Sequence, residues 1–171
     1  MSWKIRRLTA EDSDPYRDIR LEMLANCPDA FGDSHDANIT KTKTDWQTML
    51  IGSRAFFGAF VEGELVGTVN FLQETATKMV HRGLLLGMYV KQEMRGTGCA
   101  RALVETVLVH AKGKVLQVHL GVGAHNMPAI RLYEKAGFEH YGTDPRALRV
   151  EDRFLDEHLM VKFLDRKTSN E

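Results

Sequence analysis

The segment 95–100, which reads Arg-Gly-Thr-Gly-Cys-Ala, carries the clearest chemical signal of the chain. It lies between an apolar run at residues 84–90 and an amphipathic pattern that starts near Ala100. Glycine lets a backbone curl until several N–H groups point to one side, and the positive end of a following helix adds to their attraction for anions. The sequence therefore predicts a phosphate or pyrophosphate site.

Two common phosphate loops do not fit this segment. A dinucleotide-binding fingerprint needs a small residue at the sixth position counted from Gly96, where Arg101 stands instead. A Walker A loop needs Gly-Lys followed by Ser or Thr, and this combination occurs nowhere in the chain. A nicotinamide-dependent enzyme, a kinase and an NTPase are therefore all disfavoured.

A third pattern, Gln/Arg-x-x-Gly-x-Gly/Ala, does fit, with Arg95, Gly98 and Ala100 at the defined positions. In segment 126–138, an Asn that can cap a helix is followed by a Tyr on that helix and by Gly-Phe at its end. Both segments occur in the order found in the GCN5-related N-acetyltransferases. The chain therefore resembles this family, known as GNAT, over roughly residues 5–164.

Hydrophobic periodicity predicts the elements that position these segments. We expect strands at residues 4–8, 54–61, 64–73, 84–90, 115–122, 139–143 and 154–163, and helices at 15–26, 45–51, from 100 onward and at 127–136. The polar stretch 32–45 is predicted to be a loop. This order resembles the family's α/β (α+β) fold, a mixed, mostly antiparallel twisted sheet with helices on both faces.

Composition narrows the class of protein. The chain has 171 residues, of which 43% are hydrophobic, and this length favours a single N-acetyltransferase domain over residues 1–171. Lys plus Arg and Asp plus Glu both number 23, so no overall field favours nucleic acid or an anionic membrane as a partner. The separated Cys27 and Cys99 and the charged start of the chain indicate reduced thiols in a cytoplasmic protein.

The resemblance implies acetyl-CoA (coenzyme A) as the co-substrate and no metal. The last strand before the loop is expected to splay from its neighbour near residues 115–120, so that the backbone of Met88 and Val90 binds the pantetheine arm. Asn126 is expected to contact that arm as well as cap its helix. The pyrophosphate is expected on the segment that comprises Arg95, Gly96, Thr97, Gly98, Cys99 and Ala100.

The resemblance also implies the reaction, direct attack of a primary amine of a small molecule or peptide on the thioester. Tyr133 is the candidate proton donor to the leaving thiolate, and the Val90 N–H the candidate donor to the oxyanion. Some family members carry a carboxylate on the strand before the loop, but residues 83–90 contain none. The general base therefore stays open among Glu74, His81, His119, Asp156 and Glu157.

Simpler readings compete with these roles. Tyr133 can be a core aromatic, Asn126 a cap only, and Cys99 either a nucleophile at a helix start or, as we favour, a small buried side chain. For the whole chain, the alternatives are a CoA-binding regulatory or degenerate module without transfer activity, and a nucleotide-binding protein. The resemblance also allows a homodimer, which is frequent in the family, and leaves the acceptor amine open.

Overall fold

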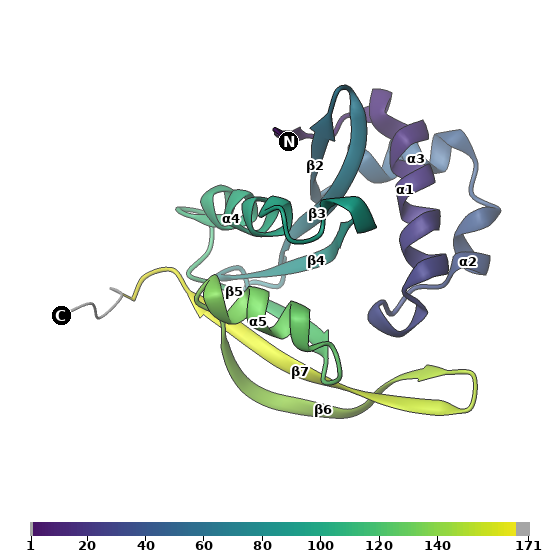
Figure 1. Ribbon diagram of the computed structural model, residues 1–171. Coiled ribbons are helices and arrows are strands. Elements are labelled where there is room, and N and C mark those ends of the chain that lie inside the picture. The colour runs from purple at the N-terminus through teal and green to yellow at the C-terminus, as the bar shows by residue number, and fades with distance from the viewer. Residues whose placement is uncertain (1, 167–171) are drawn as a thin grey trace.

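A seven-stranded sheet with the strand order β1-β2-β3-β4-β5-β7-β6 forms the centre of the protein (Figure 1). The structure, a computed structural model, describes residues 2–166. All neighbouring strands are antiparallel except β4 and β5, which are parallel, so the predicted mixed, mostly antiparallel sheet is confirmed. The strands are β1 (Lys4–Arg7), β2 (Ala55–Val61), β3 (Glu64–Gln73), β4 (Arg82–Val90), β5 (Gln117–Gly123), β6 (Glu139–Val150) and β7 (Arg153–Phe163).

Helices cover both faces of the sheet (Figure 1). On one face, α1 and α3 pack against β2 and β3, while α4 and α5 pack on the opposite face. The helices are α1 (Ser13–Asn26), α2 (His35–Ile39), α3 (Lys43–Leu50), α4 (Cys99–Ala111) and α5 (Met127–Lys135). Short 3-10 turns are η1 (Ala10–Asp12), η2 (Pro28–Ala30) and η3 (Gln92–Met94).

Two apolar layers result from the alternation of side chains along the strands. Phe57 and other residues of β2 and β3 pack on α4, whose inward side chains are fully buried. The preceding Phe56 points to the other face, where its ring meets Tyr16 of α1 edge-on at 5.2 Å. Successive strand residues face opposite sides, so consecutive phenylalanines hold a helix on each face.

The prediction of a loop at residues 32–45 was wrong, because this stretch contains α2 and the start of α3. Ser34 caps α2 by accepting a hydrogen bond from the Ala37 N–H at 3.3 Å. At α3, Thr42 and Asp45 each accept from the other's backbone N–H, which forms a capping box. Caps stabilise such short helices without the long apolar stripe on which the prediction relied.

Two further predictions needed correction at strand ends. The first closing strand continues to Val150 instead of ending at residue 143, with a register shift between Asp144 and Leu148 and a left-handed backbone at Arg146 (φ 55°). Leu116, which lies inside the predicted strand 115–122, precedes β5 and is 51% exposed. The long β6–β7 hairpin therefore reaches beneath the loop between α1 and α2 (Figure 1).

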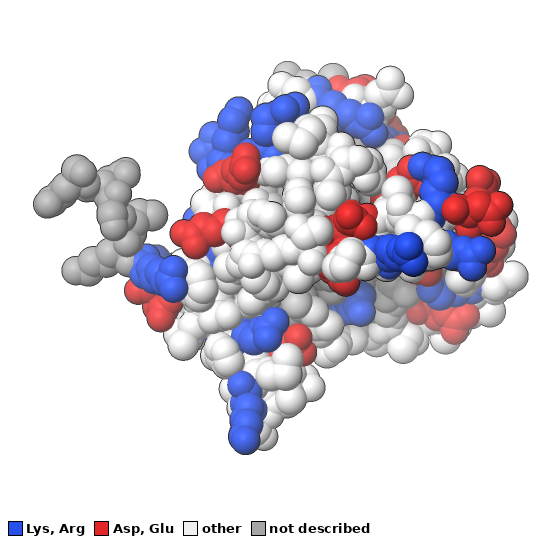
Figure 2. Space-filling model, turned by 90° about the horizontal axis from the view of Figure 1, so that it is seen from below, with Lys and Arg blue, Asp and Glu red and all other residues white. Residues whose placement is uncertain are grey.

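Charged side chains of both signs are mixed over the surface. On the face drawn in Figure 2, lysine and arginine alternate with aspartate and glutamate around a largely uncharged centre. Between residues 2 and 166, none of the helices has the length and apolar content to cross a bilayer.

Candidate active site

The glycine loop before α4 has the backbone shape that the sequence predicts. Gly96 and Gly98 both adopt left-handed conformations, with φ of 77° and 91°, which residues with a Cβ rarely occupy. Thr97 fixes the loop from inside, since its hydroxyl donates to the Met94 carbonyl at 2.7 Å and accepts from the Cys99 N–H at 3.3 Å. The loop is therefore both exposed and held in shape.

Four N–H groups of this loop have no hydrogen-bond acceptor within residues 2–166. They belong to Gly96, Gly98, Ala100 and Arg101, and the last two open the first turn of α4. Unpaired N–H groups at the start of a helix carry partial positive charge and bind anions. The exposed Arg95 directly precedes Gly96 and adds a positive charge to this segment. These residues fit a pyrophosphate.

Strands β4 and β5 separate along half of their length. They pair only through Arg82 with Gln117 and the next two residue pairs, which end at Leu84 with His119. The remainder of β4 up to Val90 has a strand neighbour on its β3 side only. The expected splay is thus present, and its open end lies beside the glycine loop that follows Val90.

The Val90 amide faces this opening. The N–H of the next residue, Lys91, donates to the Val66 carbonyl of β3 at 2.9 Å, and successive strand residues turn their amides to opposite sides. The N–H and C=O of Val90 therefore point away from β3, toward the gap. A buried backbone group without a strand neighbour needs another partner, so a peptide-like ligand such as the pantetheine arm fits here.

Met88 lies in a β-bulge of the same strand. Between the pairs of Tyr89 with Thr68 and Leu86 with Asn70, two β4 residues, Gly87 and Met88, oppose one β3 residue. A bulge changes the direction of the side chains that follow it and ends regular pairing. Met88 packs partly buried against the α4 layer, at the edge of the gap where the resemblance places it.

Tyr133 of α5 is 6% exposed, and its ring meets Phe138 edge-on at 5.8 Å. Burial raises the pKa of its hydroxyl, so the group stays protonated at neutral pH. Within the described residues, no hydrogen bond is formed by this hydroxyl, and its oxygen is not among the fully enclosed polar atoms that lack a partner. A protonated hydroxyl with no internal acceptor is available to donate to a ligand.

Asn126 and Cys99 take the local roles expected from the sequence. Asn126 caps α5, since its side-chain oxygen accepts from the Ala129 N–H at 3.3 Å, and its side-chain amide is left unengaged among residues 2–166. Cys99 is fully buried, and burial raises the pKa of its thiol. Because thiolates and not thiols are nucleophilic, Cys99 serves as a small core side chain.

The five candidate bases occupy different places. Glu74 and His81 lie at the closed end of the β4–β5 pair, where the Glu74 N–H donates to the Arg82 carbonyl and the His81 carbonyl accepts from β5. Asp156 accepts from the Arg146 N–H within the β6–β7 hairpin. These three are away from the open end of the gap or engaged in the hairpin.

His119 and Glu157 share the face of the sheet opposite α4 and α5. Burial lowers the pKa of His119, and its two ring nitrogens contact Gln117 at 2.8 Å and the Tyr141 hydroxyl at 3.3 Å. The Glu157 carboxylate lies over Gly121 of β5, two residues beyond the last β4–β5 pair. Burial raises the pKa of Glu157, and Asp144 raises it further.

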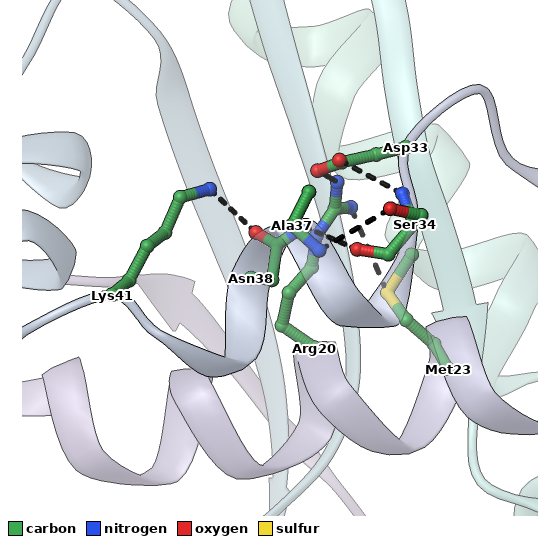
Figure 3. A network of polar contacts seen from close by, with 7 residues as sticks. All are labelled: Arg20, Met23, Asp33, Ser34, Ala37, Asn38 and Lys41. Atoms are coloured by element: carbon green, nitrogen blue, oxygen red, sulfur yellow. Dashed lines mark hydrogen bonds and ion pairs between the residues drawn. The ribbon is translucent and has the colours of Figure 1, made fainter.

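Sequence reasoning missed the polar network that holds the α1–α2 segment on the same side of the sheet (Figure 3). Arg20 of α1 donates to Asp33 at 2.9 Å, and the Asn38 amide donates to the Ser34 carbonyl at 2.8 Å. Asn38 of α2 is 1% exposed, and the Arg20–Asp33 pair joins the residues just before α2 to α1. Arg20 and Asp33 are thirteen positions apart in irregular sequence, which leaves no periodic signal for such a pair.

This segment also reaches the β6–β7 hairpin. The turn η2 packs on β5 and β6, and Arg153 at the start of β7 donates to both carboxylate oxygens of Asp29 at 3.0 and 3.1 Å. The face that carries Glu157 is thus bordered by α1–α2 and by the hairpin. Within residues 2–166, no group of His, Cys, Asp and Glu side chains is arranged to hold a metal ion.

Comparison with known proteins agrees with this arrangement. Residues 16–138 match the acetyltransferase (GNAT) family. A mycothiol acetyltransferase of Thermobispora bispora is 32% identical over 77% of this chain and 46% of its own length. An N-alpha-acetyltransferase of Sulfurisphaera tokodaii is also 32% identical, over 53% of this chain and 63% of its own. The chain thus spans about half the length of curated relatives that it matches.

Solved structures share the fold. A GNAT acetyltransferase of Streptococcus pneumoniae is 23% identical and superimposes with a TM-score of 0.84 over 95% of this chain and all of its own. A Salmonella typhimurium structure, described with its cofactor acetyl-CoA, is 18% identical and has a TM-score of 0.81 over all of this chain and 99% of its own. At such identities the likeness concerns the fold.

Proposed function

The chain belongs to the acetyltransferase (GNAT) family, and on this premise we propose that residues 1–171 act as one N-acetyltransferase domain that transfers an acetyl group from acetyl-CoA to a primary amine of a small molecule or peptide. One observation carries the proposal: the opened end of the β4–β5 pair lies beside a loop with four unpaired N–H groups. An anion site next to an unfilled strand position matches the diphosphate and the amide-containing arm of coenzyme A.

The residues on the coenzyme side bind and orient. Acetyl-CoA supplies an activated thioester carbon when it is bound. The four unpaired amides of the loop, those of Gly96, Gly98, Ala100 and Arg101, neutralise its diphosphate. Val90 offers its backbone N–H and C=O to the pantetheine arm or to an oxygen that gains negative charge. The unengaged Asn126 amide can donate to the same arm.

Tyr133 is the proposed proton donor to the departing thiolate. Its pKa is raised by burial, so the hydroxyl is protonated across the neutral range and can supply a proton to sulfur. A core aromatic with the same packing would need only the ring, whereas the Tyr133 hydroxyl forms no hydrogen bond within the described residues and is not an enclosed atom, which supports the donor role.

The face opposite α4 and α5, here called the acceptor side, is where the acceptor amine would bind, and several kinds of amine are compatible with it. Relatives carry names as different as mycothiol acetyltransferase and N-alpha-acetyltransferase. In this chain the corresponding side is lined by side chains from α1–α2 and the β6–β7 hairpin. We therefore propose a small-molecule or peptide amine that enters from this side.

A CoA-binding module without transfer activity is the second candidate. One observation favours it, because β4 (Arg82–Val90) contains no carboxylate to act as base. Such a module would keep the loop and the gap yet turn nothing over.

Thiol release separates the two candidates. Purified protein would be incubated with acetyl-CoA and, separately, with spermidine, free lysine and a tripeptide with a free amino terminus, and binding would be followed by calorimetry. Amine-dependent thiol release supports the transferase. Binding of CoA without turnover with any amine supports the module, and efficient displacement of CoA by ATP or NAD would refute both.

A further inference from the structure

Strand β5 has no side chain at one position beside the gap, because that position is a glycine, Gly121. Gly121 is exposed although it lies in the interior of the seven-stranded sheet, and its neighbours Leu120 and Val122 point into the α4–α5 layer. A Cβ on Gly121 would lie on the opposite face, only 2.9 Å from the Glu157 Oε2 atom. The missing side chain therefore leaves room for a carboxylate directly on the surface of β5.

The strand register fixes Glu157 at this place. Glu157 of β7 pairs with Gly123 of β5 and, on its other side, with Asp144 of β6. Residues directly opposite one another in antiparallel strands share a face. Glu157 and Asp144 therefore lie on the face opposite α5, and within residues 2–166 neither carboxylate is paired with a Lys, Arg or His side chain.

Tyr133 and Glu157 thus stand on opposite faces of the sheet, and Glu157 lies at the open end of the β4–β5 gap. Tyr133 belongs to the layer formed by α4 and α5, and Glu157 to the face bordered by α1–α2 and the hairpin. A thioester held in the gap would have a proton donor on one side and a proton acceptor on the other. Glu157 would then supply the carboxylate that β4 lacks.

We propose that Glu157 is the general base of this protein and binds the acceptor's ammonium group before accepting its proton, an inference that rests on the proposed function. The ammonium gives one proton to Glu157, and the freed lone pair forms the C–N bond to the thioester carbon. The C–S bond breaks with its electron pair on sulfur, which takes the proton of Tyr133. The nitrogen then loses its second proton to water. Glu157 releases its proton to water as well, and Tyr133 regains a proton from water.

Several groups near Glu157 set its protonation. Asp144 faces it from β6, and His119 lies on the same face of β5. From η2, which packs on β5 and β6, Asp29 is already paired with Arg153. Burial and the nearby Asp144 charge raise the pKa of Glu157, which moves a carboxylate toward the range in which it can exchange protons with an amine near neutral pH.

Two substitutions test the role from different directions. Glu157→Gln removes the base with little change in shape, and kcat/KM should fall by about 10² or more at neutral pH with unchanged CoA affinity. Gly121→Ala keeps the carboxylate but its Cβ displaces Oε2, and the fall should be about 10-fold to 100-fold because a displaced catalytic group loses its alignment. Adding Gly121→Ala to Glu157→Gln should lower kcat/KM no further, since both substitutions disrupt the same interaction of the Glu157 carboxylate.

Two readouts do not depend on turnover. Carbon-13 NMR of the Glu157 carboxyl should show a pKa above that of an ordinary glutamate, and Asp144→Asn should lower it because the like charge is gone. Calorimetry of the protein saturated with CoA should show weaker spermidine binding in Glu157→Gln. Glu139→Gln, which alters an exposed carboxylate on the same face of β6, is the matched control and should change neither readout.

The pH profile gives the third readout. Glu157 works when deprotonated, so wild-type activity should rise with pH through its pKa, and Asp144→Asn should move this rise to lower pH. Glu157→Gln should instead gain activity only as free amine forms at alkaline pH. Equal activity of Glu157→Gln and wild type at every pH would overturn this inference alone. A wild type that turns over none of the three amines would overturn the proposed transferase as well.

Discussion

The two sides of the gap between β4 and β5 differ in composition, since one presents backbone groups and the other presents side chains. The proposed coenzyme side consists of the backbone N–H groups of Val90 and of the four unpaired amides of the glycine loop, whose shape depends on two glycines and one threonine hydroxyl. The acceptor side consists of side chains from α1–α2, β5 and the β6–β7 hairpin, joined by ion pairs. Backbone groups bind what every member of a family shares, whereas side chains can change with the acceptor.

The largest effect should come from the coenzyme side. Gly98→Val should abolish acetyl-CoA binding without unfolding the protein, because valine cannot adopt φ of 91° without strain and the loop must change shape. A Cβ there would meet only Trp3, at 3.7 Å, so no core packing is lost. Calorimetry with acetyl-CoA measures the loss.

A matched control exists for this substitution. Gly113 has a similar φ of 80° after α4, and nothing lies within 4 Å of its Cβ position. Gly113→Val carries the same backbone strain away from the loop and should bind acetyl-CoA as wild type does. Unchanged affinity in Gly98→Val would refute the anion loop, and equal losses in both variants would attribute the effect to strain.

Tyr133→Phe should have the next largest effect, on the reaction and not on binding. The ring and its contact with Phe138 remain, so CoA affinity should be unchanged while turnover falls by about 10² to 10⁴ at neutral pH. Steady-state kinetics with the best of the three amines and calorimetry with CoA separate these quantities. Full activity in the variant would leave Tyr133 as a core aromatic.

On the acceptor side, Asp33→Ala should weaken amine recognition while leaving CoA affinity unchanged. It removes the partner of Arg20 and the acceptor for the Ser34 N–H. Shielded hydrogen bonds to charged groups are each worth about 1.5–3 kcal/mol, but the Asp33 side chain is 37% exposed, so solvent screening should limit the combined loss of unfolding free energy to about 2 kcal/mol. The KM for the amine should rise several-fold as α2 loosens. Urea unfolding and steady-state kinetics give both values.

Asp18→Ala is the control for this prediction. Asp18 pairs with Arg17 on the same helix, but both side chains are exposed, and such pairs contribute about 0–1 kcal/mol. A rise in the amine KM in this control as large as in Asp33→Ala would mean that the network does not shape the acceptor side.

The smallest effect should appear in acid, at the start of α1. Arg6 holds the pKa of Asp12 below its ordinary value through two hydrogen bonds of 2.8 Å. A carboxylate with a lowered folded pKa stabilises the protein at pH above about 4, and this contribution is lost as the pH falls through the folded pKa. Asp12→Asn should therefore lower the unfolding free energy at pH 7 by about 1–2 kcal/mol and by less near pH 3.

Hydrogen exchange compares the two sides in the same experiment. Between pH 7 and 3, protection of α1 should fall more than that of α4, whose packing involves no ion pair among its buried residues. Equal loss in both helices would show that acid acts on the whole core.

The difference between the two sides also explains what the sequence could predict. The loop 95–100 and the segment 126–138 are local: glycine, proline and capping residues act within a few positions, so their geometry follows from their order. Helix α4 was predicted from its apolar spacing, and all five of the residues that the structure buries on it lie in that pattern or next to it.

The acceptor side could not be predicted in this way. Glu157 and Gly121 meet only because β7 pairs with β5 in one register, and Arg20 meets Asp33 only because η2 folds back over the sheet. Short helix α2 and the extended β6 depend on caps and on pairing with a partner strand, which tertiary structure supplies. The five candidate bases could therefore be reduced to His119 and Glu157 only from their positions in the structure.

Only three residue pairs join β4 to β5 as strand partners, so backbone hydrogen bonding between strands β1–β4 and strands β5–β7 is confined to one end of this boundary. A ligand bound between the separated parts of β4 and β5 would supply the hydrogen-bond partners that these strands lack there. Any molecule that binds only the folded state raises the melting temperature with the logarithm of its concentration. Coenzyme A should thus connect the two groups of strands as well as react. Without it, the protein should unfold first at the boundary between β4 and β5.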